Sequence, residues 1–269
     1  MKKHLVAAVL CCMAAPAFAQ EEAPPGPVIV SGNIALVSDY RFRGVSQSDK
    51  HMAVQGGLTV THESGLYGGV WGSNLAGWGT FGGSNMELDL VGGYKLPIGG
   101  MTVDAGLTWY MYPGGASDTD FAEPYVKLSG TLGPVTALAG IAYAPKQQAL
   151  GNYSATPQSR GQKKDNLYLW GDVSMGIPGT PVTAKAHLGY SNGNPGLGPN
   201  GTSVAPTGEY LDWLIGADYV LGPVTLGVAY VDTDISKRDS AYLQPNFSST
   251  KNGSSIAGSR LVLSISAAF

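Results

Sequence analysis

Charged side chains recur at every second position in otherwise apolar segments of this sequence. Glu87 and Asp89, for example, alternate with Met86, Leu88 and Leu90. Successive side chains of a β-strand point to opposite faces, so this pattern predicts a strand with one polar and one apolar face. If the polar faces of several strands surround one interior, their acids and bases can form an aqueous channel that selects polar solutes. The same groups can instead pair with one another and close that interior.

The alternation predicts which residues face this interior. They include eight acids and six bases, so their charges are nearly balanced. His51 is predicted to share the inner face. The predicted pore-lining residues are Asp39, Arg41, Arg43, Gln55, Glu87, Asp89, Lys95, Asp104, Glu123, Lys127, Asp172, Lys185, His187, Asp212, Asp218 and Arg260.

Arg41 and Arg43 follow Asp39 on the polar face of the first predicted strand, near its outer end. The planar fork of a guanidinium group suits carboxylate or phosphate solutes. We favour the simpler interpretation, in which both arginines pair with Asp39 and with acids of adjoining strands.

Twelve segments carry a strand pattern. Each is long enough to cross a bilayer at a tilt, which takes about 9–11 residues. After residue 19 no apolar run approaches the length of about 18 residues that a membrane helix requires. The predicted strands are 30–43, 51–62, 65–76, 85–97, 100–112, 121–132, 135–145, 165–177, 181–192, 208–221, 224–235 and 259–269.

The connections between these segments are alternately tight and long. Leu132-Gly-Pro-Val-Thr136 recurs as Leu221-Gly-Pro-Val-Thr225, and the Gly and Pro residues supply the dihedral angles of tight turns. Transmembrane barrels have short periplasmic turns and longer extracellular loops. The sequence therefore predicts an all-β, antiparallel up-and-down transmembrane β-barrel with both chain ends on the periplasmic side. The long connections are 44–50, 77–84, 113–120, 146–164, 192–207 and 236–258.

The apolar strand faces could point outward to lipid or inward to a core. Apolar residues outside and polar residues inside are the arrangement of a transmembrane barrel. The inverse arrangement, a soluble barrel or sandwich, would leave many aromatic residues exposed to water. Aromatic residues near the strand ends fit the two membrane interfaces, where half-polar rings are favoured. They are Tyr40, Phe42, Tyr94, Trp109, Tyr190, Trp213, Tyr219 and Phe269.

The last ten residues, 260–269, alternate almost strictly and end the chain on Phe269. An unpaired strand at a free end would be an adhesive edge in water. We therefore expect this strand to pair with the first strand and close the barrel, with Phe269 at the periplasmic interface.

The first 19 residues have the features of a cleaved signal peptide. Lys2 and Lys3 precede an apolar run at residues 5–15 that is too short for a membrane helix, and Ala17-Phe18-Ala19 forms a cleavage site. Both cysteines lie in this segment, so we expect no disulfide in the mature chain.

Beyond the signal peptide we expect a Pro-rich lead-in at residues 20–29 and the barrel at residues 30–269. Loss of Lys2 and Lys3 reduces the basic residues from 16 to 14 against 19 acidic ones, a net charge of −5. This acidic balance argues against nucleic acid as a partner. Export and strand pattern together predict a location in the outer membrane of a Gram-negative bacterium.

Catalytic motifs are missing from the sequence. It contains neither G-x-S-x-G nor H-E-x-x-H, and the mature histidines are only His51, His62 and His187. A lipid hydrolase would need a Ser–His pair on the lipid face near the outer leaflet, but His62 is predicted at a turn and His51 inside. We therefore predict no enzyme activity, no cofactor and no metal.

Two early stretches support a family resemblance. Residues 38–47, SDYRFRGVSQ, resemble the opening strand of the TorF-like porin family of proteobacteria, whose pattern is SDYxFRGxSQ. Residues 53–57 and 65–74 resemble the next hairpin of that family. The resemblance implies an outer-membrane porin barrel. It also implies that a barrel assembly machinery recognises the C-terminal strand ending in Phe269.

These observations predict an outer-membrane porin for passive diffusion of small hydrophilic solutes. The alternative is a closed structural or surface-binding barrel without conductance. Outer-membrane lipids and lipopolysaccharide are expected partners. Loop 146–164 carries Lys146, Arg160, Lys163 and Lys164, which could contact lipopolysaccharide phosphates, although a solvated charge run is the simpler interpretation. Loop 236–258 is long enough to fold into the mouth as a gate or constriction.

Overall fold

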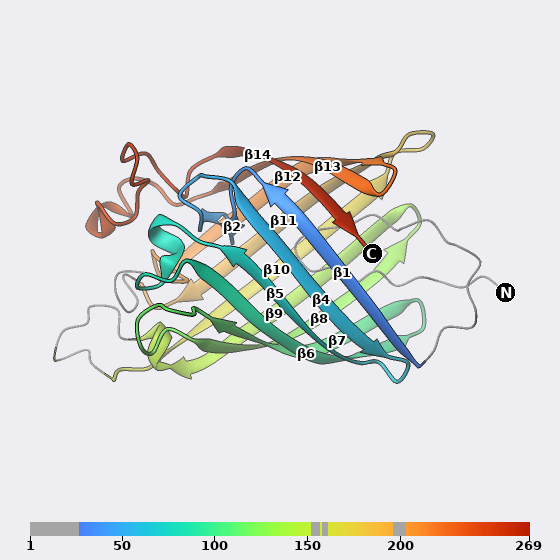
Figure 1. Cartoon of the computed structure of the whole chain (residues 1–269), viewed down its shortest axis with the longest axis horizontal. Coiled ribbons are helices and arrows are strands. Elements are labelled where there is room, and N and C mark those ends of the chain that lie inside the picture. The colour runs from blue at the N-terminus through green and yellow to red at the C-terminus, as the bar shows by residue number, and fades with distance from the viewer. Residues whose placement is uncertain (1–26, 152–156, 158–160, 196–202) are drawn as a thin grey trace.

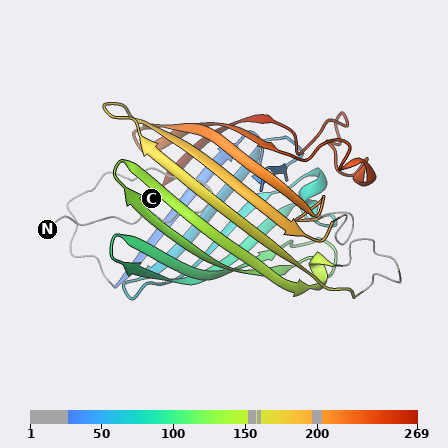
Figure 2. The ribbon, with the colours of Figure 1, turned by 180° about the vertical axis from the view of Figure 1, so that it is seen from behind.

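The computed structural model describes residues 27–151, 157, 161–195 and 203–269. In this part of the chain, twelve antiparallel strands form a closed barrel in which each strand pairs with its neighbour along the chain (Figures 1 and 2). The predicted antiparallel up-and-down barrel is confirmed. The barrel strands are β1 (Val28–Val37), β4 (Ala53–His62), β5 (Leu66–Asn74), β6 (Met86–Ile98), β7 (Met101–Met111), β8 (Phe121–Leu132), β9 (Val135–Gln147), β10 (Lys164–Gly176), β11 (Val182–Gly193), β12 (Glu209–Leu221), β13 (Val224–Thr233) and β14 (Arg260–Ala268).

Closure is made by the first and last strands, as the sequence predicts. β1 pairs with β14 from Asn33 opposite Ala268 to Val37 opposite Ser264. The backbones of Gly32 and Phe269 exchange two further hydrogen bonds, of 2.8 and 3.0 Å. The chain end is thus held in the sheet, which removes the free edge that a terminal strand would expose.

The contact between Gly32 and Phe269 yields a test of closure. A Cβ on Gly32 would lie 2.5 Å from the tip of the Phe269 ring, an exposed side chain that can turn aside, so Gly32→Val is expected to displace the terminal ring and lower the folded fraction, at a cost of up to about 0.5 kcal/mol. Heat-modifiable mobility in gel electrophoresis measures that fraction. Gly68→Val is the matched control, because the nearest atom to its Cβ lies 3.8 Å away. Equal folded fractions for the two variants would contradict the steric argument.

The two ends of the barrel differ in their connections. Tight turns at 63–65, 99–100, 133–134, 177–181 and 222–223 share one end, the turn end, while the long connections share the other, the loop end (Figure 1). This matches the predicted alternation. Within the described residues, three of the long connections contain short 3₁₀-helices: η1 (Gly77–Thr80), η2 (Gln148–Leu150) and η4 (Ala241–Leu243).

The predicted end of the first strand, at residue 43, is wrong. β1 ends at Val37, and residues 38–50 turn into the barrel as an inward hairpin built on β2 (Arg41–Phe42) and β3 (Val45–Ser46). Arg43 and Gly44 take φ angles of 48° and 77°, which form a turn that a continuous strand could not contain. Asp39, Arg41 and Arg43 therefore do not lie on the barrel wall.

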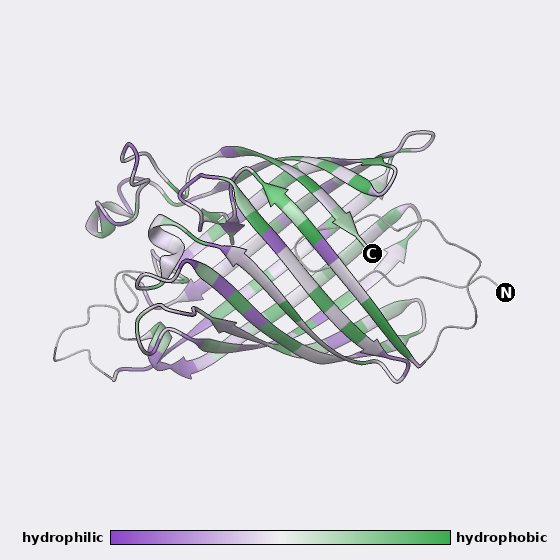
Figure 3. Ribbon diagram, viewed as in Figure 1, coloured by the Kyte–Doolittle hydropathy of each residue, from purple (hydrophilic) through white to green (hydrophobic). Residues whose placement is uncertain are grey.

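The outer surface of the barrel is apolar. Ile34, Leu90, Leu188, Ile215 and Leu263 are each between 46% and 66% exposed on the outside of the wall. Figure 3 shows hydrophobic and hydrophilic positions alternating along the strands. Such a surface fits the hydrocarbon core of a bilayer. Among the described residues, no helix is long and apolar enough to cross a membrane.

Most of the aromatic residues assigned to the membrane interfaces do lie outside. Tyr94, Trp109, Tyr219 and Phe269 are exposed on the outer surface, and Tyr190 and Trp213 are half-exposed. Tyr40 and Phe42 contradict the prediction, because the inward hairpin carries both into the interior. Their rings pack edge-on against Trp71 and Tyr110, at centroid distances of 5.5 and 5.8 Å.

The predicted signal peptide, residues 1–19, lies outside the described residues, as does most of the predicted lead-in. β1 begins at Val28, two residues before the predicted start. The other strand ends differ from the predicted ones by only a few residues.

Candidate functional site

The wall of the barrel directs charged side chains into its interior. Glu87 and Asp89 are 3% and 7% exposed, whereas Leu90 beside them is 46% exposed on the outside. Of the predicted pore-lining residues, the structure places these on the inner side of the wall: Gln55, Glu87, Asp89, Lys95, Asp104, Glu123, Lys127, Asp172, Lys185, His187, Asp212, Asp218 and Arg260. Arg260 lies at the loop-end rim, opposite Val231, and is exposed.

Arg43 extends across the interior to the far wall. Its Nη2 donates to both carboxylate oxygens of Glu123 on β8, at 2.7 Å each. The guanidinium also lies 4.1 Å from the ring centre of Tyr168 and 4.7 Å from that of Phe42. The Arg43 and Glu123 side chains are only 5% and 4% exposed. This buried pair fixes the tip of the inward hairpin, while Nη1 of Arg43 has no hydrogen-bond partner.

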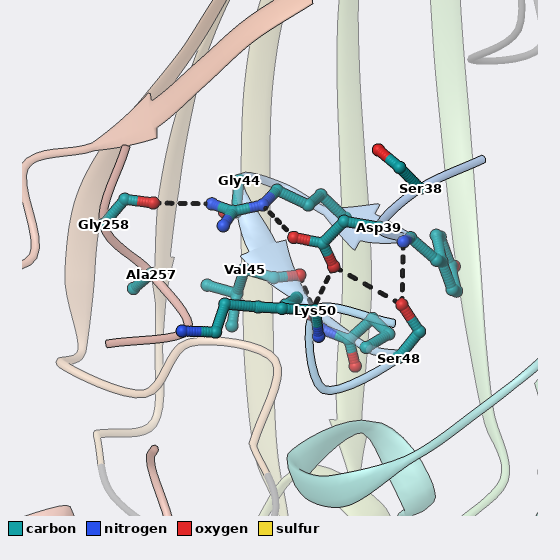
Figure 4. Close-up of polar contacts among 12 residues, drawn as sticks. Ser38, Asp39, Gly44, Val45, Ser48, Lys50, Ala257 and Gly258 are labelled. Carbon is teal, nitrogen blue, oxygen red and sulfur yellow. Dashed lines mark hydrogen bonds and ion pairs between the residues drawn. The ribbon is translucent and has the colours of Figure 1, made fainter. Parts of the chain in front are cut away.

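Arg41 holds the base of the hairpin. Its Nε donates to Asp39 at 2.9 Å, and its Nη1 donates to the carbonyl oxygens of Gly44 and Gly258 at 2.8 Å (Figure 4). Asp39 also accepts a 2.5 Å hydrogen bond from Ser46. Arg41 thus pairs with Asp39, as the simpler interpretation expects, whereas Arg43 pairs with an acid of the far wall and not with Asp39 or an adjoining strand.

Pairing of the last strand with the first also predicts that Arg260 lies across the seam from Arg41 and Arg43 and forms a basic patch with them. That proximity is only partly present. Arg41 is hydrogen-bonded to Gly258, close to Arg260 along the chain, but Arg43 points to Glu123 on the far wall. The three bases therefore do not form one basic patch, because the turn at Arg43 and Gly44 separates the two hairpin arginines.

Connection 234–259 packs on the inward hairpin. Ser46 N–H donates to the Ile256 carbonyl oxygen at 3.0 Å, and Asp49 and Lys50 bond to Thr250 and Ser254. Partial burial lowers the pKa of the Lys50 ammonium, and the positive charge of Arg260 adds to this effect. Apolar residues from both segments form a cluster with η1 and β12: Val45, Trp78, Tyr210, Leu243, Phe247, Ile256 and Ala257. Instead of entering the barrel, this loop covers the segment that does.

Aromatic rings complete the filling of the loop-end half. Phe81, from the connection between β5 and β6, stacks on Tyr112 at 4.3 Å, and Tyr110 stacks on Phe121 at 4.6 Å. Tyr40 donates to Glu87 at 3.1 Å. Because these groups are buried, the described loop-end half of the interior is packed with side chains.

The ion pairs of the turn-end half are more exposed than those of the loop-end half and lie on two walls. On β6 to β8, Lys95 and Lys127 outnumber Asp104, a formal charge of +1. Lys127 pairs with Asp104 at 3.2 Å. Their side chains, at 17% and 12% exposed, are more accessible than the buried Arg43–Glu123 pair.

The second wall, β10 to β12, also carries ion pairs. Lys185 pairs with Asp218 at 2.6 Å, and His187 lies between Asp172 at 2.7 Å and Asp212 at 3.2 Å. Asp212 borders the loop-end half, because it lies next to Gly44 of the inward hairpin. Lysine and carboxylate groups thus face the turn-end half from both walls.

Several interior groups were not among the predicted pore-lining residues. Tyr168 bonds to His187 at 2.9 Å, and Tyr67 bonds to Asp104 at 2.7 Å and to Tyr125. The alternation of these tyrosines with apolar residues could have indicated that they face inward. A tyrosine, however, suits either face of a strand, so the pattern did not decide it. For β5, glycines on both faces left the orientation of Tyr67 and Trp71 undecided.

The two remaining histidines, His51 and His62, lie at opposite ends of the barrel. His51, predicted to face inward, is exposed at the loop end, because β4 begins only at Ala53. His62 lies at a tight turn, with its Nδ1 2.9 Å from Ser64 Oγ. Loop 146–164 falls partly outside the described residues, including Arg160.

The comparisons with known proteins place the chain in a family. Residues 21–269 match the family model described as "Bacterial protein of unknown function (Gcw_chp)". The chain belongs to this Gcw_chp family. No curated protein matches its sequence.

Solved membrane barrels resemble this Gcw_chp member in fold. A chain from a study of the in-meso crystallization of membrane proteins shares 10% identity at a TM-score of 0.50, over 89% of this chain and 83% of that one. A porin refined at 1.8 Å resolution shares 10% identity at a TM-score of 0.45, over 90% of this chain and 100% of the porin chain. An outer membrane channel from Pseudomonas putida F1 shares 12% identity at a TM-score of 0.43, over 92% of this chain and 97% of the channel chain. At these identities the first likeness shows the fold alone.

Proposed function

We propose that this protein is an outer-membrane channel of a Gram-negative bacterium that passes small hydrophilic solutes by passive diffusion. The observation that carries the proposal is the division of the wall into an apolar outside and an ionic inside. An apolar exterior suits lipid, and partly exposed ion pairs such as Lys185–Asp218 suit water in the turn-end half of the interior. No cofactor and no energy source enter this function.

The inward hairpin is the proposed constriction of the channel. It contacts β6 through Tyr40 and Glu87, β8 through Arg43 and Glu123, and β12 and β13 next to Gly44. A segment that contacts several walls obstructs the path between them. The hairpin contains the stretch SDYRFRGVSQ that resembles the TorF-like porin pattern, so we propose that this motif builds the constriction.

The partners follow from location and surface. We propose that residues 1–19 direct export, that lipids cover the apolar belt, and that lipopolysaccharide contacts the loop end. Phe269 is 70% exposed beside the closing seam, where the barrel assembly machinery could recognise it. The packed loop-end half favours one alternative, a closed structural or surface-binding barrel.

Conductance separates the two functions. Refolded protein in a planar bilayer is expected to produce discrete, small single-channel steps, because the hairpin narrows the path. Heat-unfolded protein in the same detergent is the control. If the folded wild type and a folded variant without the hairpin are both electrically silent, the channel proposal is wrong and the closed barrel stands.

A further inference from the structure

Two carboxyl groups in the loop-end half, Glu87 and Asp89, have no base beside them among the residues that the structure describes. Asp39 and Glu123 are neutralised by Arg41 and Arg43. Glu87 accepts a hydrogen bond from the Tyr40 hydroxyl at 3.1 Å, and the Oδ1 atom of Asp89 is buried without a hydrogen-bond partner. Both side chains lie next to each other on the inner face of β6.

The surroundings of this pair are aromatic. In the sheet register Asp89 lies opposite Trp71 on one side and Tyr110 on the other. A cavity of about 10 Å³ adjoins Glu87, which is about one water-sized sphere. Its lining is Phe42, Val45, Gln47, Phe81, Glu87, Tyr112, Ser203, Val204, Pro206 and Tyr210.

Charge balance indicates what belongs there. A buried carboxylate without a partner is costly, so such groups are paired or take up a proton. Aromatic ring faces attract cations, and the cavity limits the ion to about the size of water. Among the described residues, no group of three or more His, Cys, Asp or Glu side chains could hold a metal ion, which argues against a divalent cation.

We propose that Glu87, Asp89 and the adjoining cavity form a binding subsite for a small monovalent cation, of ammonium or potassium size. This inference rests on the proposed channel, in which the subsite would lie beside the constriction and favour cations over anions. Glu87 lines the cavity and would contact the ion, and Asp89, two residues along β6, adds a second buried carboxyl group nearby. The rings of Phe42, Phe81 and Tyr112 supply the aromatic part of the lining.

Thermal unfolding in detergent tests the subsite without any current. A ligand that binds only the folded state raises its melting temperature, so ammonium chloride is compared with the bulky N-methylglucamine chloride at equal concentration and pH. The wild type is expected to melt roughly 3–6 °C higher in ammonium chloride, the shift expected for a ligand in about tenfold excess over its Kd. Potassium chloride should act in the same direction.

Asp89→Asn and Glu87→Gln should each lose most of this shift, because both keep the side-chain shape and remove a charge. Asp239→Asn, at an exposed loop residue, should retain it. A proton in place of the cation would leave the wild-type melting temperature equal in the two salts, and that result overturns the proposal. So does an equal shift in wild type and both β6 variants. If the protein conducts no current in a planar bilayer, that result contradicts the proposed channel function but not the cation subsite.

Discussion

Replacing residues 38–52 by a two-residue Asn-Gly turn is expected to raise single-channel conductance several-fold. The replacement removes the inward hairpin and leaves the barrel wall, because Val37 and Ala53 are already partners in the β1–β4 register. A two-residue turn is the commonest way to join paired antiparallel strands, and Asn-Gly suits it. The interior would then lose the segment that contacts β6, β8 and β12.

The measurement is conductance in planar bilayers, with folding verified by heat-modifiable gel mobility. Ser117→Gly, in an exposed part of another loop, is the control and should conduct as the wild type does. A folded hairpin-free barrel whose steps equal those of the wild type would show that the hairpin does not limit the current.

Arg43→Met is expected to lower the free energy of unfolding by about 3–5 kcal/mol, because it leaves the buried Glu123 carboxylate without its partner. The double variant Arg43→Met with Glu123→Leu should recover most of that loss, since apolar replacement of a whole buried pair is often neutral or stabilising. Urea unfolding of the refolded protein, followed by Trp fluorescence, measures both values.

Lys185→Met is the comparison for this experiment. Its pair with Asp218 is partly in water, with the Lys185 side chain 20% exposed, so solvent screening should reduce the loss to about 1 kcal/mol or less. Similar losses for Arg43→Met and Lys185→Met would mean that the Arg43–Glu123 pair does not fasten the hairpin.

The barrel wall could be predicted because its signals are local. Along β6, β7, β11 and β12, residues facing lipid must be apolar and those facing inward can be charged, so period-two alternation marks each strand and its facing. The Gly-Pro turns at 133–134 and 222–223 carry their own chemistry. Where both faces are small, as in β5 with Gly68, Gly69 and Gly72, the facing could not be predicted.

The inward hairpin could not be recognised by the same rule. Asp39, Arg41 and Arg43 alternate with Tyr40 and Phe42 whether the segment lies in the wall or inside. Its position depends on partners far along the chain. Tyr40 packs on Trp71 and Arg43 bonds to Glu123, which is 80 residues away. Only Gly44 offered a local indication, and a glycine also fits a loop after a longer strand.

The amino-acid sequence by itself thus determined the closed barrel, its turn and loop ends, and the inner face of its wall, because lipid imposes a rule that each strand must satisfy alone. The tertiary structure alone decided what fills the interior. It shows that Arg41 and Arg43 are bound to protein acids, and that no base in the described part of the chain pairs with Glu87 or Asp89. Charge pairing across a barrel joins residues on different strands, and their relative heights are set by the register of the whole sheet.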